Sequence, residues 1–291
     1  MDSNKFTIAS WNIEADRTKE NHNGLDNSNI PKIINKIFEM NPDILCLQEM
    51  QNCIGQVYYN KCKYCNNNTC KQNHAKTIDN ILNILGYEGE YFNKTMINTI
   101  GIYYKKNKFE LCKQKSHCHK MAKIEYKPFK NNKINKGFII AILRHIKSNK
   151  KIKICNVHLS VPELNENNEI IDISKQIFEI ETINTYIKQT HFSNNIPVIL
   201  VGDFNSISSK LKSKVIDNSI YNILTSKYKS GYKNLLGEEL NFTNWKINKS
   251  NEYSFKECID YIFYDKKYLK SKNILEFYNE PPNNFSSDHI P

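Results

Sequence analysis

Acidic, amide and imidazole side chains follow or interrupt short apolar runs along this chain of 291 residues. The ones that could act together are Asn12, Glu49, His158, Asp203, Asn205, Asp260, Asp288 and His289. Separated carboxylates suit a hard divalent cation, amides can orient water or phosphate, and imidazoles can carry or stabilise charge. Magnesium in particular prefers carboxylate and water oxygens and keeps positions open for substrate phosphate. The set therefore predicts metal-assisted hydrolysis of a phosphoester.

The segment 197–206, with the sequence PVILVGDFNS, carries two of these side chains. Its apolar residues 198–201 are too few for a helix and predict a strand buried on both faces, which Gly202 ends. Asp203 and Asn205 are two residues apart, so we expect them on the same side at the edge of the sheet, where α/β proteins bind ligands. Because Gly, Asp, Asn and Ser also favour turns, an ordinary turn is the alternative.

Other apolar runs predict strands that end on or contain one of the polar residues: 6–11 before Asn12, 42–48 before Glu49, 151–158 with His158, and 258–264 with Asp260. Two more predicted strands cover residues 99–104 and 137–147. An acid inside an apolar run needs a partner, because burying an unpaired carboxylate is costly. The structural alternatives are a solvated strand end for each acid and a hydrogen-bonded core residue for the histidine.

Isoleucines at helical spacing predict amphipathic helices over three segments: 30–38, 78–85 and 172–188. Asn29 is placed to cap the first helix, and Pro31 is tolerated in its first turn. Residues 207–257 are mixed and polar, and they predict loops and short helices along one edge of the sheet. Strands that alternate with helices indicate the α/β class.

The net charge of +11 at pH 7 favours a polyanionic partner, because lysine and arginine neutralise phosphates. However, Arg17 and Arg144 are the only arginines, and the chain is also rich in Asn and Ile. Lysine, asparagine and isoleucine share A/T-rich codons. The base composition of the gene therefore explains the charge as well as selection for a nucleic-acid partner does.

Targeting signals and membrane spans are not found in the sequence. No apolar run approaches the roughly 20 residues of a membrane span, and the first residues, MDSNKF, are too polar for a signal peptide. Among the nine cysteines, Cys46, Cys155 and Cys258 lie in apolar runs, where free cysteine packs as a small hydrophobe. We expect an intracellular protein, cytoplasmic rather than nuclear, without a disulfide framework or a membrane partner.

Residues 50–77 are polar, rich in Asn and Cys, and predict an insertion. Within it Cys62, Cys65, Cys70 and His74 follow the spacing C-x₂-C-x₄-C-x₃-H, which suits tetrahedral zinc. A structural Zn²⁺ would fold a segment that has almost no apolar residues of its own. The alternative is a group of reduced surface thiols in a loop that tolerates cysteine.

Six motifs together resemble the motif set of the endonuclease/exonuclease/phosphatase superfamily, in the same order: Ser10-Trp-Asn12, Leu47-Gln-Glu49, Asn156-Val-His158, Gly202-Asp-Phe-Asn205, Ile259-Asp-Tyr261 and Ser287-Asp-His289. They span nearly the whole chain. The resemblance implies an α/β fold in which a two-sheet sandwich is flanked by helices and the active site lies at the strand ends. It also implies a single catalytic domain over residues 1–291, with the Cys-rich insertion at about 50–77.

The same resemblance assigns metal ligands. It implies that Glu49 binds Mg²⁺ with help from Asn12, and that Asp288 is a further ligand. Mn²⁺ is the alternative ion, because it also takes carboxylate and water oxygens.

Catalytic roles also follow from the resemblance. Asp203 would activate or position the attacking water, and Asn205 would orient that water and contact the phosphate. His158 and His289 would stabilise the charged transition state, which is usually the largest catalytic contribution. Asp260 would hold His289, which would give the buried acid the partner it needs.

Two segments resemble the deadenylase-like branch of the superfamily, which includes the carbon catabolite repression deadenylases, nocturnin and angel. They are NFTNW at 241–245, followed closely by 259–264, and LGYEGEY at 85–91. That branch hydrolyses RNA from the 3′ end, often poly(A), or removes a phosphate from nucleotides. We therefore expect a 3′-5′ exoribonuclease of the deadenylase type, with RNA favoured over DNA as its nucleic-acid substrate.

Other functions stay open at this point. Residues 11–14 (WNIE) also resemble tyrosyl-DNA phosphodiesterases and abasic-site endonucleases, so a DNA repair nuclease is the first alternative, beside a nucleotide phosphatase. A non-catalytic RNA-binding homologue is disfavoured, because every acid and imidazole of the set is retained. Protein partners and base preference are not predicted.

The sequence departs from the branch in three places. Ser286 stands where the branch has Pro before Ser-Asp-His, and the insertion at 50–77 has no counterpart. The family continues after that motif into a last apolar strand, whereas this sequence ends at Pro291. This predicts either a weakly anchored segment around Asp288 and His289 or a longer natural chain.

Overall fold

The structure is a computed structural model, and the residues it describes are 5–13, 29–50, 74–92, 99–112, 125–128, 136–166, 170–189, 195–206, 220–247, 253–255, 258–274, 287 and 289–291. Every structural statement below refers to these residues. Within these ranges, the structure has no helix with the length and apolar character that crossing a membrane requires.

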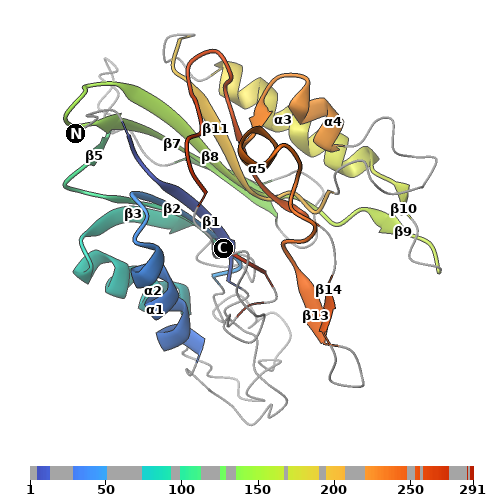
Figure 1. Ribbon diagram of the computed structural model, residues 1–291, viewed down its shortest axis with the longest axis horizontal. Coiled ribbons are helices and arrows are strands. Elements are labelled where there is room, and N and C mark those ends of the chain that lie inside the picture. Colours follow the sequence, from blue (N-terminus) through green and yellow to red (C-terminus); the bar gives the residue numbers. More distant parts are fainter. Residues whose placement is uncertain are drawn as a thin grey trace.

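Two sheets form the centre of the molecule (Figure 1). The first sheet has the order β1 (Ile8–Asn12), β2 (Ile44–Gln48), β4 (Ile100–Lys105), β3 (Tyr87–Phe92). The second sheet has the order β12 (Lys229–Ser230), β15 (Asp260–Tyr264), β11 (Val198–Asp203), β8 (Lys151–His158), β7 (Gly137–His145), β5 (Phe109–Leu111), with β6 (Glu125–Pro128) also paired to β7. Two separate hairpins are formed by β9 (Glu163–Leu164) with β10 (Ile170–Asp172) and by β13 (Trp245–Ile247) with β14 (Tyr253–Phe255).

Helices cover the outer faces of both sheets, so the layers run helix, sheet, sheet, helix (Figure 1). The helices are α1 (Asn29–Met40), α2 (His74–Ile84), α3 (Ser174–Gln189), α4 (Ile220–Thr225) and α5 (Gly231–Leu236). The α1 and α2 helices pack on the first sheet, and α3 and α4 pack on the second. The two-sheet α/β sandwich implied by the sequence is therefore confirmed.

Strands between two apolar layers must be apolar on both faces, and β2 shows how the sequence achieves this. Ile44 and Cys46 point to the second sheet, whereas Leu45 and Leu47 point to the helices, as the two-residue period of a strand requires. All five residues of β2 are buried. The described cysteines Cys46, Cys112, Cys155 and Cys258 are free and buried.

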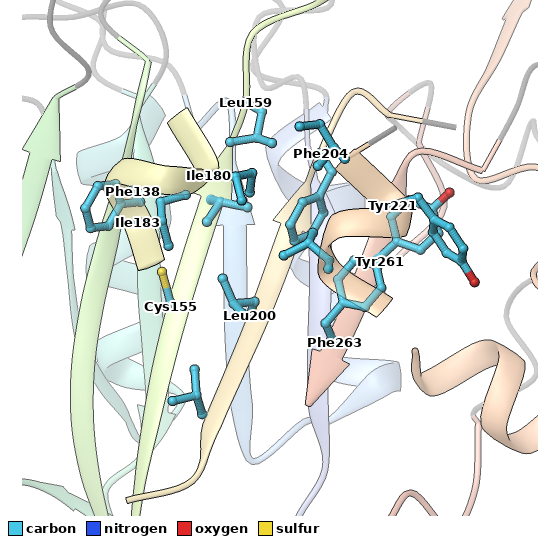
Figure 2. Packing of buried hydrophobic residues seen from close by; sticks show 14 of the residues in the cluster. Phe138, Cys155, Leu159, Ile180, Ile183, Leu200, Phe204, Tyr221, Tyr261 and Phe263 are labelled. Atoms are coloured by element: carbon cyan, nitrogen blue, oxygen red, sulfur yellow. The ribbon is translucent and has the colours of Figure 1, made fainter. Parts of the chain in front are cut away.

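The outer core of the second sheet is mostly aliphatic under α3 and aromatic under α4 (Figure 2). Ile180 and Ile183 of α3 lie against the face of β8, and Tyr221 of α4 lies near Tyr261 and Phe263 of β15 (Figure 2). The isoleucine spacing that predicts the helix over 172–188 is therefore the spacing of its buried face.

Three local expectations were wrong. The β11 strand does not end at Gly202 but continues to Asp203. The α2 helix begins at His74, so residues 74–77 belong to it and not to the predicted insertion. Within 207–257 the structure adds the β13–β14 hairpin to the expected short helices. Sequence reasoning did not find these two strands, because each has only three residues, too few to show the alternation of polar and apolar residues that marks a strand.

A polar side chain at the centre of the interface joins the two sheets. Asn156 of β8 is fully buried, and its Nδ2 donates to Leu47 O at 2.9 Å and to Gly101 O at 2.8 Å in the first sheet. Its Oδ1 accepts from Gln48 Nε2 at 2.7 Å. Because these groups cannot reach water, the contacts fix how the sheets sit on each other.

We predict that Asn156→Leu, which keeps the volume but removes all three hydrogen bonds, lowers the free energy of unfolding by about 3 kcal/mol or more, since each stranded buried group costs about 1–3 kcal/mol. Urea unfolding measures this as a lower midpoint with an unchanged slope. The matched control is Asn83→Leu on the exposed face of α2, which should change stability by no more than about 0.5 kcal/mol. Equal midpoints for Asn156→Leu and the unchanged protein would show that this contact does not hold the sheets together.

Candidate active site

Parallel strand pairs bring the candidate residues to one edge of the sandwich. In the first sheet β1 runs parallel to β2, with Asn12 beside Gln48, so that Glu49 follows directly. In the second sheet Asp203 lies between His158 of parallel β8 and Asp260 of antiparallel β15. Ligand sites of α/β proteins form at such strand ends. Residues far apart in the sequence, such as Asn12 and Asp203, which are 191 positions apart, thus meet at this edge.

Asn12 connects the two sheets at this edge. Its Nδ2 donates to Glu49 Oε1 at 3.3 Å and to Asp203 Oδ2 at 3.1 Å. The imidazole Nε2 of His158 lies 3.5 Å from both of these carboxylate oxygens. Asp203 and His158 are each about 2% exposed by residue, whereas the side chain of Glu49 is 23% exposed. Glu49 is therefore the carboxylate of this group that faces outward.

The backbone around the site adopts rare conformations. Glu49 and Asn205 have φ values of 50° and 45°, in the left-handed region that non-glycine residues seldom occupy. Gly202 has a φ of 137°, and a Cβ there would lie 2.0 Å from Val157 O. Such strain persists only where surrounding contacts hold it, and it concentrates at functional sites.

The position of Asn205 differs from the expectation. Since β11 ends at Asp203, the alternation of the strand does not extend to Asn205. Instead its N–H donates to Asp203 Oδ1 at 2.8 Å, and its Nδ2 donates to Leu159 O at 3.0 Å. The segment after β11 is thus both a turn and part of the site. The two interpretations of residues 197–206, as an ordinary turn and as a functional site, do not exclude each other.

Asp260 and His289 form a second pair at the same edge. His289 Nδ1 lies 2.8 Å from Asp260 Oδ2, which also accepts from Thr243 Oγ1 at 2.7 Å. The Thr243 hydroxyl in turn accepts from the N–H groups of Ile259 and Asp260, both at 3.0 Å. The sequence predicts a partner for the buried Asp260 carboxylate, and the His289 imidazole is that partner.

The segment around His289 is anchored, contrary to the expectation of a weakly held end. Trp11 Nε1 donates to His289 O at 3.0 Å, and Ser287 Oγ donates to Asn12 O at 2.6 Å. Ile290 is 4% exposed and joins the core under the first sheet. Asp288 lies outside the described residues, and its assignment as a metal ligand stays a prediction.

Lys136 is a site residue that the sequence reasoning missed. Its Nζ lies 2.8 Å from His158 Nε2 and donates to Leu159 O at 2.6 Å. The sequence offered only the two adjacent predicted strands 137–147 and 151–158, and the register of the hairpin that they form is visible only in the structure. In that hairpin Gly137 pairs with His158, which puts residue 136 beside residue 159.

Burial and charge change the acidity of these groups. Burial raises the pKa of Asp203 to about 6, and the neighbouring Asp260 contributes. Burial also raises the pKa of Glu49 and lowers the pKa of Lys136, while the opposite charges of these groups act against both shifts. Burial and the nearby Lys136 hold the pKa of His158 well below its usual value. The imidazole of His158 is therefore neutral at pH 7, and Lys136 supplies the positive charge beside it.

The donor set fits a hard divalent cation. Oxygen or nitrogen atoms of Asp203, Asp260 and His289 all lie within 4.8 Å of one another. Among the described residues, the buried Asp260 Oδ1 has no hydrogen-bond partner, and Glu49 and Asp203 share the single amide of Asn12. An oxygen without a donor and two carboxylates on one amide leave negative charge that a divalent cation would offset.

The zinc hypothesis stays a prediction. Cys62, Cys65 and Cys70 lie outside the described residues, and His74 is the first residue of α2.

The chain is similar in sequence to several known proteins. No family model matches the chain. Similar curated proteins include the CCR4-Not complex 3'-5'-exoribonuclease subunit Ccr4 of Kluyveromyces lactis, which is 27% identical over 89% of this chain and 36% of that protein. Human Nocturnin is 24% identical over 89% of this chain and 55% of its own length. The chain therefore covers less than two thirds of the length of each of these two relatives.

Solved structures match almost the whole chain. The catalytic domain of human Nocturnin with bound sulfate superposes with a TM-score of 0.60 and 22% identity, over 98% of this chain and 91% of that one. An endonuclease/exonuclease/phosphatase family protein from Bacteroides thetaiotaomicron superposes with a TM-score of 0.62 and 17% identity, over 98% and 94%. The chain has the endonuclease/exonuclease/phosphatase fold. In sequence it is similar to deadenylase-like proteins, as its motifs indicate.

Lys136 acts electrostatically on both largely buried carboxylates of this site, Glu49 and Asp203. We predict that Lys136→Met lowers the free energy of unfolding of metal-free protein by about 3 kcal/mol or more, because it removes one partner of a buried charged group. Mg²⁺ should then stabilise Lys136→Met more than the unchanged protein, since a divalent cation replaces the lost counter-charge and binds more tightly. Urea unfolding with and without Mg²⁺ measures both effects.

The matched control is Lys153→Met. Lys153 is also buried, but its Nζ donates to Ile187 O at 2.9 Å, on the side of α3. That variant should lose stability without gaining any additional response to Mg²⁺. The same Mg²⁺ response in Lys136→Met and in the unchanged protein would contradict the assignment of Lys136 as the counter-charge.

Proposed function

We propose that this chain is a divalent-metal-dependent phosphodiesterase that removes nucleotides from the 3′ end of RNA, with poly(A) as its favoured substrate. The observation that carries the proposal is the pair of carboxylates, Glu49 and Asp203, held by one amide of Asn12 beside Lys136 and His158. It is supported by the similarity to relatives that are named as 3'-5'-exoribonucleases. The single catalytic domain over residues 1–291 belongs to the same proposal.

The residues of the site have separate roles in this hydrolysis. Asp203, whose pKa is raised to about 6, is ionised at pH 7 and accepts a proton from the attacking water. Asn205 orients that water through its side-chain amide. Lys136 brings positive charge to the phosphoryl oxygens, with His158 accepting from its ammonium and orienting it, and His289, which Asp260 holds, stabilises charge on the same oxygens.

Glu49 and Asn12 would hold Mg²⁺ or Mn²⁺, with Asp288 as a further ligand, and the ion would supply Lewis-acid stabilisation of the phosphoryl oxygens. Glu49 is suited to this role because, with 23% of its side chain exposed, it is the more accessible of the two carboxylates that Asn12 holds.

Two alternatives have the same fold. A structure of zebrafish TDP2 with a single-stranded DNA product superposes with a TM-score of 0.61 and 17% identity, over 98% of this chain and 96% of that one. A fold shared at this level does not separate RNA, DNA and nucleotide substrates. A DNA repair nuclease and a nucleotide phosphatase are therefore the alternatives that the assay must distinguish.

The experiment is a cleavage assay with Mg²⁺ on matched 5′-labelled oligo(A) RNA, mixed-sequence RNA and DNA, with mononucleotides as a fourth substrate. We expect a ladder that shortens from the 3′ end of oligo(A), slower cleavage of mixed RNA, and intact DNA. Glu49→Gln and Asp203→Asn keep the side-chain size but remove the charge, so each should reduce the rate at least about 100-fold.

The matched control is Glu181→Gln on the exposed face of α3, which should cleave within about twofold of the unchanged protein. Preferential cleavage of DNA would support the repair nuclease instead. Release of phosphate from nucleotides without any shortening of polymers would support the phosphatase. RNA binding without hydrolysis of any substrate would support a non-catalytic homologue.

A further inference from the structure

Two buried polar residues on α3 belong to no part of the site described above. Gln176 and Glu179 are each 1% exposed, and they lie one turn apart on the face of the helix that also carries Ile180 and Ile183. An apolar side chain at either position would extend this face without any desolvation cost. Their burial therefore requires an explanation in the polar contacts that they make.

Gln176 contacts both loops that leave the catalytic strands. Its Nε2 donates to Ser160 O at 2.8 Å, in the loop that follows β8. The same nitrogen lies 2.8 Å from Asn205 O and 3.2 Å from Phe204 O, in the turn that follows β11. One amide thus connects the backbone just after His158 to the backbone of Asn205.

Glu179 holds the first of these loops a second time. Its Oε2 accepts from Ser160 N at 2.8 Å, and its Oε1 accepts from Ser160 Oγ at 2.5 Å. Both oxygens of the carboxylate are therefore used by one residue. Ser160 cannot shift without breaking contacts to two side chains of α3.

The groups held in this way are those whose positions need support. Asn205 has a left-handed φ of 45°, and its Nδ2 donates to Leu159 O. Lys136 Nζ donates to the same Leu159 carbonyl. A shift of the loop that contains Leu159 and Ser160 would therefore move the partners of His158, Lys136 and Asn205 together.

We propose that Gln176 and Glu179 are positioning residues for phosphoester hydrolysis, and that they act by fixing the two loops that orient His158 and Asn205. The inference rests on the proposed function for its kinetic test, but its structural part can be measured without any substrate. The two residues do not contact the substrate. They limit how far the catalytic groups move relative to each other, and displacements of about 1 Å are enough to slow an enzyme severely.

Gln176→Met tests the proposal most sharply, because it keeps the length of the side chain and removes its donors. We expect kcat on oligo(A) to fall about 10- to 100-fold with KM unchanged, since a misplaced catalytic group affects the transition state and not the binding of the polymer. Gln176→Asn keeps an amide but is one methylene shorter, and it serves as the milder variant if Gln176→Met does not fold. Glu179→Gln retains one acceptor for Ser160 and should lose less activity than Glu179→Met.

The matched control is Tyr221→Phe, which removes a buried hydrogen bond of 2.7 Å to Glu239 in the same outer core. It should lower stability by an amount similar to Gln176→Met, yet keep kcat within about twofold, because it supports neither loop. A purely structural role for Gln176 predicts equal kinetics for the two variants. Unchanged kcat in Gln176→Met would overturn the proposal.

Hydrogen exchange tests the positioning role of Gln176 without any substrate, and therefore independently of the proposed function. The Ser160 and Asn205 amides donate to Glu179 and Asp203, and both should exchange faster in Gln176→Met, while amides of β2 and β4 keep their rates. If the unchanged protein hydrolyses none of the substrates, the proposed function fails and exchange alone decides. Unchanged exchange at both amides would then overturn the positioning role, and faster exchange would support it.

Discussion

The convergence of carboxylates in a place where water has little access is the constraint on which the rest of this structure depends. Asp203 and Asp260 are buried, and Glu49 is largely so. Each would be unstable there without donors or positive charge, because the cost of an uncompensated buried charge is several kcal/mol. The amide of Asn12 donates to Asp203, and the ammonium of Lys136 lies beside His158 in the same group. Asp260 is contacted by the Thr243 hydroxyl and the His289 imidazole.

These partners come from both sheets, so the constraint extends to the fold. Asn12 belongs to the first sheet, and the residues that it must reach in the second sheet are placed by the register of β8, β11 and β15. That reach is possible only if the sheets keep one relative position. Asn156, which donates to two carbonyls of the first sheet, provides such a fixed position a few residues before His158. The contacts between the two sheets therefore also determine where the charged groups of the site lie.

The regular elements could be predicted from sequence because their patterns are local. The β8 strand has the predicted bounds 151–158, and the isoleucine spacing located α1 and α3 to within a few residues. The candidate acids and imidazoles could also be selected, because together they match the motifs of a known superfamily, whereas each alone is compatible with an ordinary strand end. The described members of that set do meet at one edge of the sandwich, as the resemblance to the superfamily implied.

What could not be predicted depends on contacts between distant segments. Gln176 looks like any polar residue of an amphipathic helix, and only the structure shows its amide facing three carbonyl groups. Lys136 is one of many lysines in a basic chain, and its place became visible through the register of β7 and β8. The left-handed conformation of Glu49 carries no sequence signal, because glutamate is not a residue that favours it.

The central claim is that these buried carboxylates form the site of a divalent cation. Crystals of the protein soaked with Mn²⁺ test it most directly, through anomalous scattering from the ion. We predict a strong peak in contact with the carboxylate of Glu49, close to Asn12 and Asp203, and its loss in crystals of Glu49→Gln with the surrounding side chains unmoved. A peak that touches neither Glu49 nor Asp203, or a peak that survives in Glu49→Gln, would contradict the account.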